Sequence, residues 1–444
     1  MKVVIIGGVA AGMSAASKIR RLDAGIQVTV YEKGGFLSYG ACGLPYYVGG
    51  FNDDYRKMIA RSREAFETMG VKTFLRHEVR SVDPEKKQVV VKDLESGREF
   101  IDSYDKLMIA TGAEAIIPPF SLRDLLGIHV LKTMEDGIFL KEFSKMQKVK
   151  NVVIVGGGYI GVECAEAFLH SGKNVRIIET ASRVLAPFDG EIGALAQEEL
   201  IHQGVMLHTG ERVEAFLGDG LYVSHVKTDK AVYEADLVVV AVGIRPCTGF
   251  LKSTGIKMGK NGALVVDREM RTSIQDIYAA GDCILVYHEV LEEDCYQALG
   301  TVANKCGRIA GTNLAGAHEE FSGAMGSAAI KVCDLELGRT GMGEEDAKRL
   351  KVDYKTLVIK ANDHPAYYPG PTPITIKLIY EKGTKRLLGA QTCGKKGAVL
   401  RADVFAVAIH ARMTTSELGM TDLVYAPPFA GVWDAIQIAC NAAK

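Results

Sequence analysis

Cys42 stands in the stretch FLSYGACGLPYYVGG, residues 36–50, among small and aromatic residues. Its thiol, once deprotonated, is a nucleophile and a redox group. Proteins that cleave disulfides usually carry two cysteines close together, yet the nearest other cysteine in this chain is Cys164. What this single thiol can do therefore depends on what the rest of the chain brings to it.

The remaining cysteines indicate neither a metal site nor a disulfide framework. The chain has nine cysteines at scattered positions, without a CxxC or paired Cys/His spacing, so no zinc site is expected. An odd, dispersed set favours the reducing cytoplasm, where most of these thiols act as small buried hydrophobic residues. The opening residues MKVVIIGG predict a β-strand, not a signal peptide, in keeping with a cytoplasmic protein.

The composition argues against two classes of partner. A net charge of −1 gives no general attraction to nucleic acid or to an anionic membrane surface. No apolar run approaches the ~20 residues that a membrane helix needs. With 444 residues, 48% hydrophobic and 24% charged, the chain is expected to form about two to three globular domains.

A glycine motif in the middle of the chain predicts a dinucleotide site. Gly156, Gly158 and Gly161 fit G-x-G-x-x-G between a strand and a helix, within residues 151–180. The first glycine permits the tight turn, and the second lets the main chain approach a pyrophosphate. The third lets the helix pack on the strand, with the phosphate at the positive end of the helix.

The residue that ends the next strand bears on the choice of nucleotide. Glu179 follows Gly161 by 18 residues and can accept hydrogen bonds from ribose hydroxyls while repelling a 2′-phosphate. This favours NADH over NADPH, although Arg176 and Arg183 nearby leave NADPH open.

A second motif lies at the N-terminus. In GGVAAG, Gly7 and Gly12 fit the pattern, but Val9 takes the second glycine position. Glu32, 20 residues beyond Gly12, supports the assignment, as do the ATG of residues 110–112 and Asp282, whose carboxylate could hold a ribityl chain. Two dinucleotide folds need two ligands, and FAD with a nicotinamide nucleotide fits best because a flavin passes electrons onward.

The elements that must position these residues follow from hydrophobic pattern and glycine punctuation. Apolar strands and amphipathic helices alternate as in a doubly wound α/β sheet. The predicted N-terminal elements are strands 2–7 and 28–33 around a helix at 10–22. Further strands are expected in segments 104–119, 235–248 and 276–283. From about residue 323, antiparallel strands at 374–382 and 386–394 and a helix at 398–413 predict an α+β domain.

Eight motifs follow one another along the chain: GGVAAGMSAASKIRRL, SYGACGLPY, ATG, GGGYIG, YAAGDC, ANKCGR, YYPG and YAPPF. Taken in order, these motifs resemble the flavin-dependent pyridine nucleotide–disulfide oxidoreductases along essentially the whole chain. Within that family the chain is similar to the single-cysteine branch: coenzyme A-disulfide reductases, NADH oxidases, NADH peroxidases and NAD(P)H-dependent polysulfide reductases.

The resemblance implies an α/β fold with two doubly wound, Rossmann-like domains and an α+β dimerisation domain. The FAD-binding domain would comprise residues 1–112 and 245–322, and the NAD(P)H-binding domain residues 113–244. The C-terminal dimerisation domain would span residues 323–444.

The resemblance also implies which residues hold the two nucleotides. For FAD these are Gly7, Gly8, Ala10, Ala11, Gly12, Glu32, Lys33, Val79, Ala110, Thr111, Gly112, Asp282, Leu299, Gly300 and Thr301. For NAD(P)H they are Gly156, Gly158, Tyr159, Ile160, Gly161, Glu179 and Gly243.

In such enzymes a lone cysteine forms a disulfide with a small thiol or becomes a sulfenic acid. Cys42 would form a mixed disulfide with coenzyme A. It would lie at the start of a helix facing the flavin, where the positive end of the helix favours a thiolate. Gly40 and Gly43 would leave room for the ligand.

One position separates members of the branch. Its peroxidases and water-forming oxidases carry a histidine in the first glycine turn, where this chain has Ala10, and no histidine occurs before His77. A proton donor for cleaving an O–O bond is therefore missing from its expected place, which argues against both activities.

A basic helix face predicts where coenzyme A binds. Ser14, Lys18 and Arg21 share one face by i, i+4, i+7 spacing and could meet a 3′-phospho-ADP group. Ser38 precedes the cysteine by four residues, as in the reductases, whereas Ala41 stands where some relatives have Asn. The full predicted set for coenzyme A is Ser14, Lys18, Arg21, Ser38, Ala41, Cys42, Asn304 and Arg308.

Tyrosines of the C-terminal domain complete the predicted catalytic set. The resemblance implies that Tyr425 and one of Tyr367 and Tyr368, with Tyr367 preferred, reach the active site of the partner subunit. A phenol there would protonate the departing coenzyme A thiolate. The active enzyme would then be a homodimer.

The resulting hypothesis is an NAD(P)H-dependent coenzyme A-disulfide reductase acting through Cys42 and FAD, with Tyr159 covering the flavin until NADH displaces it. One alternative keeps this machinery but reduces polysulfide or persulfide, or reduces oxygen to peroxide. The absence of an appended rhodanese-like domain is expected to favour coenzyme A disulfide. Another alternative, a redox sensor without turnover, leaves the second nucleotide fold without a purpose.

Overall fold

Two runs of β-branched residues form the central strands of two parallel sheets. β1 (Lys2–Ile6) has the sequence KVVII and β10 (Asn151–Val155) has NVVIV, and both are almost fully buried. Such continuous apolar runs are typical of strands that are covered on both faces. The computed structural model describes residues 1–119 and 125–444 of the chain.

In the first unit the parallel strands follow the order β18-β7-β1-β2-β3. β1 thus lies between β2 and β7, and a crevice opens at such a reversal of strand order. The bounds are β2 (Gln27–Glu32), β3 (Val71–Leu75), β7 (Lys106–Ile109), β18 (Ile277–Ala279), α1 (Ala10–Leu22), α2 (Leu44–Val48), α3 (Arg63–Thr68) and α7 (Gly300–Leu314). Antiparallel additions are β4 (His77–Asp83), β5 (Gln88–Asp93), β6 (Glu99–Ser103), β19 (Val286–His288) and β20 (Glu293–Cys295).

The second unit repeats this plan with the order β12-β11-β10-β16-β9. Its elements are β9 (Ile128–His129), β11 (Asn174–Glu179), β12 (Met206–Thr209), β16 (Leu237–Val240), α4 (Met134–Ser144), α5 (Tyr159–His170) and α6 (Gly190–His202). An antiparallel sheet is added by β13 (Val213–Asp219), β14 (Tyr222–Thr228) and β15 (Val232–Glu234). The links between the two units pair as β8 (Ala113–Ala115) with β17 (Ile244–Pro246).

The C-terminal unit is an antiparallel sheet with the order β21-β22-β25-β24-β23. The strands are β21 (Ala328–Val332), β22 (Leu335–Gly341), β23 (Tyr354–Asn362), β24 (Pro373–Glu381) and β25 (Leu387–Gly394). The helices are α8 (Glu344–Arg349), α9 (Ala398–His410), α10 (Thr415–Gly419) and α11 (Ala435–Ala442).

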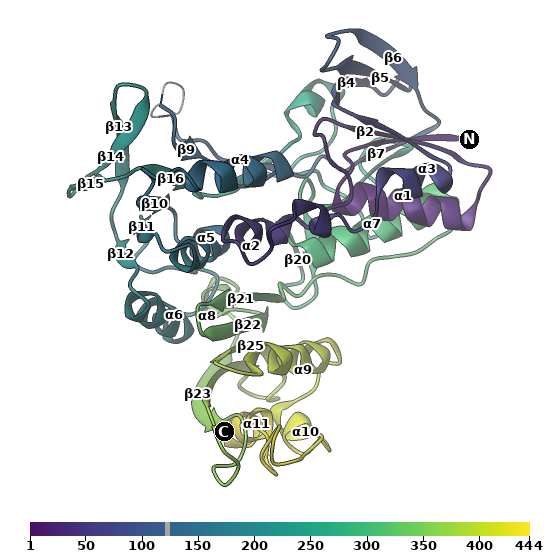
Figure 1. Cartoon of the computed structure of the whole chain (residues 1–444). Helices are drawn as coiled ribbons and strands as arrows, with labels where there is room; N and C mark the ends of the chain where they lie inside the picture. Colours follow the sequence, from purple (N-terminus) through teal and green to yellow (C-terminus); the bar gives the residue numbers. More distant parts are fainter. Residues whose placement is uncertain (120–124) are drawn as a thin grey trace.

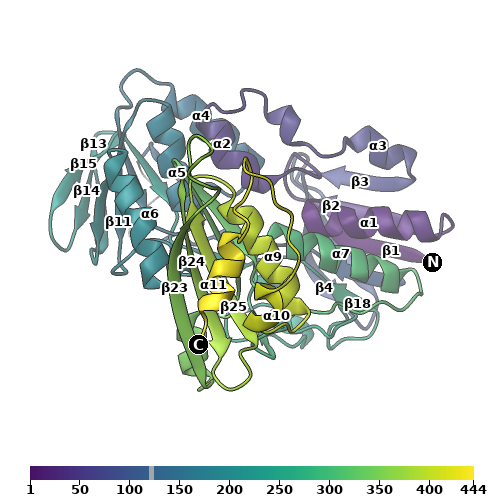
Figure 2. The same cartoon turned by 90° about the horizontal axis from the view of Figure 1, so that it is seen from below.

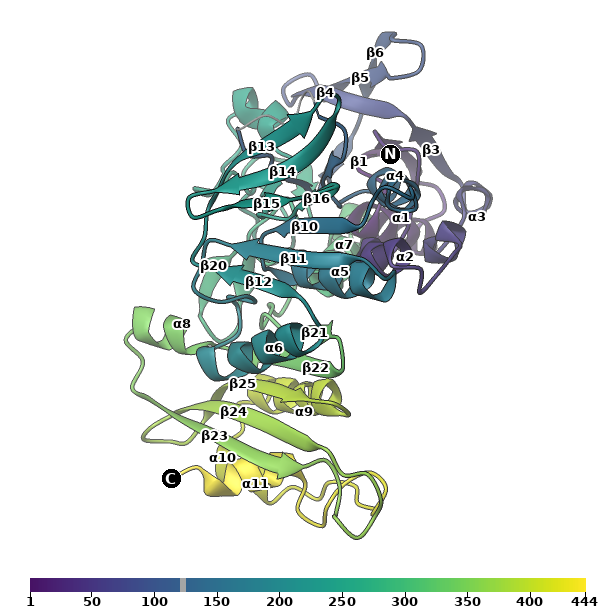
Figure 3. The ribbon, with the colours of Figure 1, turned by 60° about the vertical axis from the view of Figure 1, so that its left-hand side comes forward.

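The three units lie together as Figures 1 and 3 show, with the two α/β units adjacent and the C-terminal sheet below them. One face of that sheet joins the core of the second unit through Val332, Leu337 and Cys393. The other face carries α9 and α11, which pack on Ile374, Ile376 and Leu378 (Figure 2). The sheet therefore connects the second unit to the C-terminal helices.

The predicted α/β architecture and the α+β C-terminal unit are confirmed. The helix expected at 10–22 has these bounds, and the antiparallel strands lie within a residue of their expected places. The helix expected at 398–413 ends earlier, at His410. The exact domain boundaries stay a prediction.

Candidate active site and nucleotide sites

Cys42 lies in a short 3₁₀ turn, Ala41–Gly43, directly before α2. Its side chain is exposed, and α2 packs against α4 and α5 of the second unit. From the first unit, Gly300 at the start of α7 faces the sulfur, since a Cβ built there would lie 3.9 Å from Sγ. The thiol is thus reachable and sits where the two α/β units meet.

A helix dipole was expected to lower the pKa of the Cys42 thiol, but the groups of the protein around it raise that pKa. Desolvation by surrounding protein, followed by the charge of Glu163, raises the pKa of the Cys42 thiol, and Lys132 opposes this only in part. Burial is the largest cause, and α2, with only five residues, has a small dipole to oppose it. These surroundings disfavour the charged thiolate of Cys42. A disulfide keeps the sulfur uncharged, which fits a resting state in which Cys42 is part of a disulfide.

A carboxyl group beside the thiol was missed by the sequence analysis. Burial raises the pKa of Glu163 to about 7, and the Tyr46 hydroxyl donates to its Oε1 at 3.5 Å. Glu163 follows Tyr159 by one helical turn of α5, so both side chains share a face. That spacing was the signal that could have identified it.

The first glycine turn is held by Glu32 at the end of β2. The Glu32 carboxylate accepts the main-chain N–H groups of Gly8 and Gly34, each at 2.7 Å. Gly7 has φ +106°, and a Cβ there would lie 2.2 Å from the carbonyl oxygen of Ala110. Only glycine fits this close approach of two strand ends.

The second glycine turn has nearly the same geometry. Glu179 accepts the N–H of Gly157 at 2.6 Å and that of Ala181 at 2.7 Å. Gly156 has φ +108°, and a Cβ there would lie 2.4 Å from the carbonyl oxygen of Ala241. A Cβ on Gly158 would meet no atom of the described residues within 4 Å, so this glycine faces open space where a pyrophosphate could approach.

Other predicted flavin residues line the ends of β7 and β18. The Thr111 hydroxyl donates to the carbonyl oxygen of Cys247 at 2.8 Å, fixing the ATG turn. The Asp282 carboxylate pairs with Lys132 Nζ at 3.0 Å, a partner without any sequence signal. Val79 is buried in the core of the first unit, so only its main chain could reach a ligand.

The remaining predicted nucleotide residues fall around these turns. Ala10, Ala11 and Gly12 begin α1, Leu299 caps α7 ahead of Thr301, and Lys33 is exposed just after β2. Ile160 and Gly161 lie in the first turn of α5, and the carbonyl oxygen of Gly243 accepts the N–H of Ile116 at 2.9 Å.

The predicted coenzyme A residues gather along α1 and α7. The Ser14 hydroxyl donates to Asn304 Oδ1 at 2.7 Å, although 290 residues separate them. The helices approach closely because Gly307 lies against the main chain of Ala11. Lys18, Arg21 and Arg308 reach the surface of the same helices.

Ser38 and Ala41 lie on the chain between the first glycine turn and α2. Ser38 adopts φ +49°, and its main-chain N–H donates to the carbonyl oxygen of Gly8 at 2.9 Å. Ala41 begins the turn that carries Cys42. This connection ties the position of the thiol to the first glycine turn.

The two predicted tyrosines meet although 58 residues separate them. The hydroxyls of Tyr367 and Tyr425 share a hydrogen bond of 2.8 Å, and this bond raises the pKa of Tyr367. Tyr368 instead packs edge-on against His364. The geometry therefore favours Tyr367 over Tyr368 as the partner of Tyr425.

The surroundings of the tyrosine pair are apolar and exposed. Tyr425 belongs to the chain segment between α10 and α11, and these two helices lie at the end of the molecule away from α2 (Figures 1 and 3). Large apolar side chains are exposed here, with Val424 reaching 93% exposure. The others are Leu400, Val407, Met420, Phe429, Val432 and Trp433. An exposed apolar surface of this kind is typical of an interaction site.

Within residues 1–119 and 125–444, no group of His, Cys, Asp or Glu side chains could hold a metal ion. Across the same part of the chain, no helix is both long and apolar enough to cross a membrane.

Comparison with known proteins follows the same division of the chain. The family model described as pyridine nucleotide-disulphide oxidoreductase matches residues 1–304, and that of the family's dimerisation domain matches residues 327–436. The NAD(P)H coenzyme A polysulfide/persulfide reductase of Pyrococcus horikoshii is 38% identical over 100% of this chain and 98% of its own. The coenzyme A disulfide reductase of Staphylococcus aureus is 28% identical over the whole of both chains. The structure of reduced Bacillus anthracis CoADR-RHD superposes with a TM-score of 0.96 at 32% identity, over 100% of this chain and 80% of that one.

Proposed function

The chain belongs to the pyridine nucleotide-disulphide oxidoreductase family, and on this premise we propose that it reduces coenzyme A disulfide to two coenzyme A thiols with NAD(P)H, FAD and Cys42. The observation that carries the proposal is the exposed Cys42 thiol where the two units meet, facing Gly300 of the first unit and under the charge of Glu163 of the second. The family resemblance seen in the motifs is confirmed.

The residues present fit two dinucleotides. Glu32 and Glu179 each hold a glycine turn through main-chain N–H groups and keep further lone pairs for ribose hydroxyls. We assign FAD to the first turn and NAD(P)H to the second. When bound, the flavin accepts a hydride from the nicotinamide and delivers two electrons to a disulfide.

Cys42 divides the reaction into two disulfide exchanges. In the resting protein Cys42 forms a mixed disulfide with coenzyme A. Two electrons and a proton cleave that S–S bond, leaving the Cys42 thiolate and releasing one coenzyme A thiol. The thiolate then attacks coenzyme A disulfide, re-forms the mixed disulfide and expels a second coenzyme A thiolate, which takes up a proton. The sum consumes one NADH and one proton per disulfide.

The Tyr367–Tyr425 pair is assigned to the active site of a partner subunit. The exposed apolar surface around the pair and the family's dimerisation domain support this role. A phenol whose hydroxyl is already oriented by a 2.8 Å hydrogen bond can donate a proton to the leaving thiolate.

The paired helices α1 and α7 are assigned to coenzyme A. Lys18, Arg21 and Arg308 supply positive charge for phosphate groups, and the Ser14–Asn304 bond orients two polar side chains on the same surface. We further propose that the protein works in the cytoplasm, which its free cysteines support.

A second candidate function is reduction of polysulfide or persulfide by the same machinery. It is favoured by the higher identity to the P. horikoshii polysulfide/persulfide reductase, 38%, than to the S. aureus coenzyme A disulfide reductase, 28%. In this case the coenzyme A held on Cys42 as a mixed disulfide would be a resident cofactor and not a product.

The deciding experiment is the anaerobic rate of NADH oxidation on adding coenzyme A disulfide, with thiol release followed in parallel. Rapid oxidation with two thiols per NADH is expected. Activity that appears only with polysulfide would establish the second candidate. Activity that appears only on admitting air would identify a peroxide-forming oxidase.

A further inference from the structure

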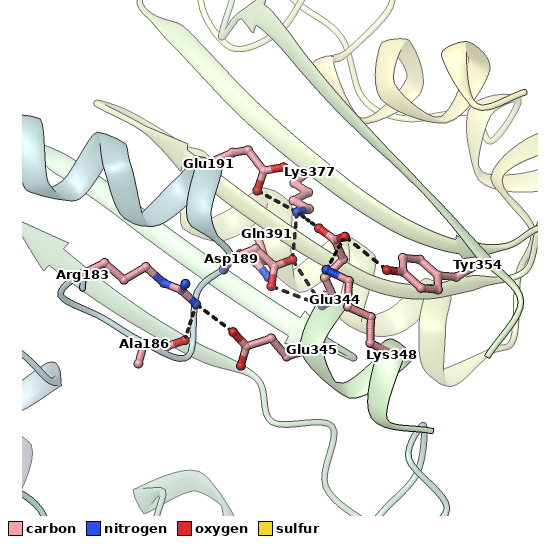
Figure 4. Close-up of polar contacts among 10 residues, drawn as sticks. All are labelled: Arg183, Ala186, Asp189, Glu191, Glu344, Glu345, Lys348, Tyr354, Lys377 and Gln391. Atoms are coloured by element: carbon pink, nitrogen blue, oxygen red, sulfur yellow. Dashed lines mark hydrogen bonds and ion pairs between the residues drawn. The ribbon is translucent and has the colours of Figure 1, made fainter. Parts of the chain in front are cut away.

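A buried lysine joins the C-terminal sheet to the second unit. Lys377 points away from α9 because its neighbours Ile376 and Leu378 face that helix, and its side chain is fully buried. Its Nζ lies 3.2 Å from Asp189, 2.7 Å from Glu191 and 2.6 Å from Glu344 (Figure 4). Although burial opposes the charged form, these carboxylates raise the pKa of Lys377 to about 12.

Asp189 and Glu191 stand at the start of α6, and the chain just before them touches the second glycine turn. This segment, residues 183–189, donates a hydrogen bond from Leu185 N–H to the carbonyl oxygen of Gly157 at 2.8 Å. The ring of Phe188 lies 6.2 Å from that of Tyr159, the first residue of α5. The 183–189 segment therefore packs on the turn assigned to the nucleotide.

The segment is held in a conformation that it would not adopt alone. Leu185 has φ +51°, in the left-handed region that residues with branched side chains avoid unless their surroundings impose it. The C-terminal unit supplies these surroundings. Lys377 pairs with Asp189, Gln391 Oε1 accepts the Asp189 N–H at 2.8 Å, and Glu345 lies 3.4 Å from Arg183 (Figure 4).

We propose that Lys377 is a positioning residue for the nicotinamide nucleotide. It fixes the 183–189 segment and, through the contacts with Gly157 and Tyr159, keeps the second glycine turn in the geometry that receives NAD(P)H. The inference rests on the proposed assignment of NAD(P)H to this turn. It makes the dimerisation domain a contributor to nucleotide affinity.

The test compares Lys377→Met with Lys348→Met in the purified FAD-loaded enzyme. Lys348 also pairs with Glu344 but is exposed and does not touch the 183–189 segment, which makes it the matched control. For Lys377→Met, the KM for NADH and the Kd for NAD⁺ by calorimetry are expected to rise roughly 3- to 30-fold. The KM for coenzyme A disulfide and kcat should stay nearly unchanged, and Lys348→Met should match the wild type. A lower melting temperature with unchanged NADH and NAD⁺ values would mean a purely structural lysine and would overturn the proposal.

Removing Lys377 leaves the buried Asp189 carboxylate without its cation, and such a change can prevent folding. Glu191→Gln is the milder variant, because this side chain is half exposed. It should raise the NAD⁺ Kd in the same direction by a smaller factor, and an unchanged value would equally overturn the proposal. Glu179→Gln shows whether the role of Lys377 or the assignment of NAD(P)H to the second glycine turn has failed. If it weakens NAD⁺ binding while the Lys377 and Glu191 variants do not, only the present inference fails. If it leaves NAD⁺ binding unchanged, the nucleotide assignment fails, and this inference with it.

Discussion

Replacing Glu179 by Gln tests which nucleotide the second glycine turn accepts. The two oxygens of the Glu179 carboxylate accept the N–H groups of Gly157 and Ala181 at 2.6 and 2.7 Å. Each oxygen keeps a second lone pair that can accept a ribose hydroxyl. The same negative charge would repel a 2′-phosphate at this position.

The magnitude follows from these contacts. Glu179→Gln removes the charge and turns one acceptor into an NH₂ group, so at least one charge-assisted hydrogen bond to a ribose hydroxyl, worth about 1.5–3 kcal/mol, is lost. NADH affinity should therefore fall about tenfold to a hundredfold, since about 1.4 kcal/mol corresponds to a factor of ten. For NADPH the loss is offset, because the repulsion removed is about 4 kcal/mol for charges about 4 Å apart at an effective dielectric constant of about 20. The lost hydrogen bond affects both nucleotides, so the kcat/KM preference for NADH over NADPH should fall on the order of 1,000-fold.

The assay is steady-state kinetics with each nucleotide at saturating coenzyme A disulfide. The matched control is Glu32→Gln, because Glu32 makes the same pair of contacts in the first glycine turn, with Gly8 and Gly34. That variant should release FAD more readily and leave the NADH:NADPH ratio unchanged. The reasoning is refuted if Glu179→Gln leaves the ratio unchanged, or if Glu32→Gln alters the ratio as strongly.

Further predictions concern the thiol and its neighbours. Cys42→Ser should abolish coenzyme A disulfide turnover while NADH still bleaches the flavin absorbance under anaerobic conditions; surviving turnover would remove Cys42 from the mechanism. Because the hydroxyls of Tyr367 and Tyr425 are 2.8 Å apart, each Phe variant should lower kcat about tenfold to a hundredfold and the double variant little further, with Tyr368→Phe as control. Additive losses would show that the two hydroxyls act separately. The carboxyl of Glu163, with its pKa raised to about 7, is charged only above that pH. In enzyme that has been reduced and freed of coenzyme A, Glu163→Gln should therefore lower the pKa of the Cys42 thiol and speed its alkylation by iodoacetamide above pH 7 but not below about pH 6. Equal rates at every pH would show that this charge does not reach the sulfur.

Much of the fold could be predicted because its signals are local. The apolar runs of β1 and β10 and the glycines that follow them specify a strand, a turn and a helix within about 20 residues. The close contacts of Gly7 and Gly156 with facing strand ends explain why this residue type recurs at both turns. Glu32 and Glu179 were found in the same way, by their distance from a glycine motif.

The electrostatics around Cys42 could not be predicted, because they come from distant parts of the chain. The helix dipole was expected to favour a thiolate, but burial and, after it, the charge of Glu163 of the second unit raise the pKa of the thiol instead. Lys132 pairs with Asp282 although 150 residues separate them, and no sequence motif predicts this contact. Burial and charge at a given point depend on every segment that packs there, and a linear pattern does not contain that information.

The amino-acid sequence by itself determined the two glycine turns, the single thiol and the family. Each depends on residue types at short spacing, where chain geometry leaves few choices. Only the tertiary structure decided that Tyr367, not Tyr368, bonds to Tyr425, that Ser14 meets Asn304, and that Lys377 holds the segment beside the second glycine turn. These contacts join residues 58 to 290 positions apart. They exist because sheets and helices pack as whole bodies, which brings together side chains that share no local pattern.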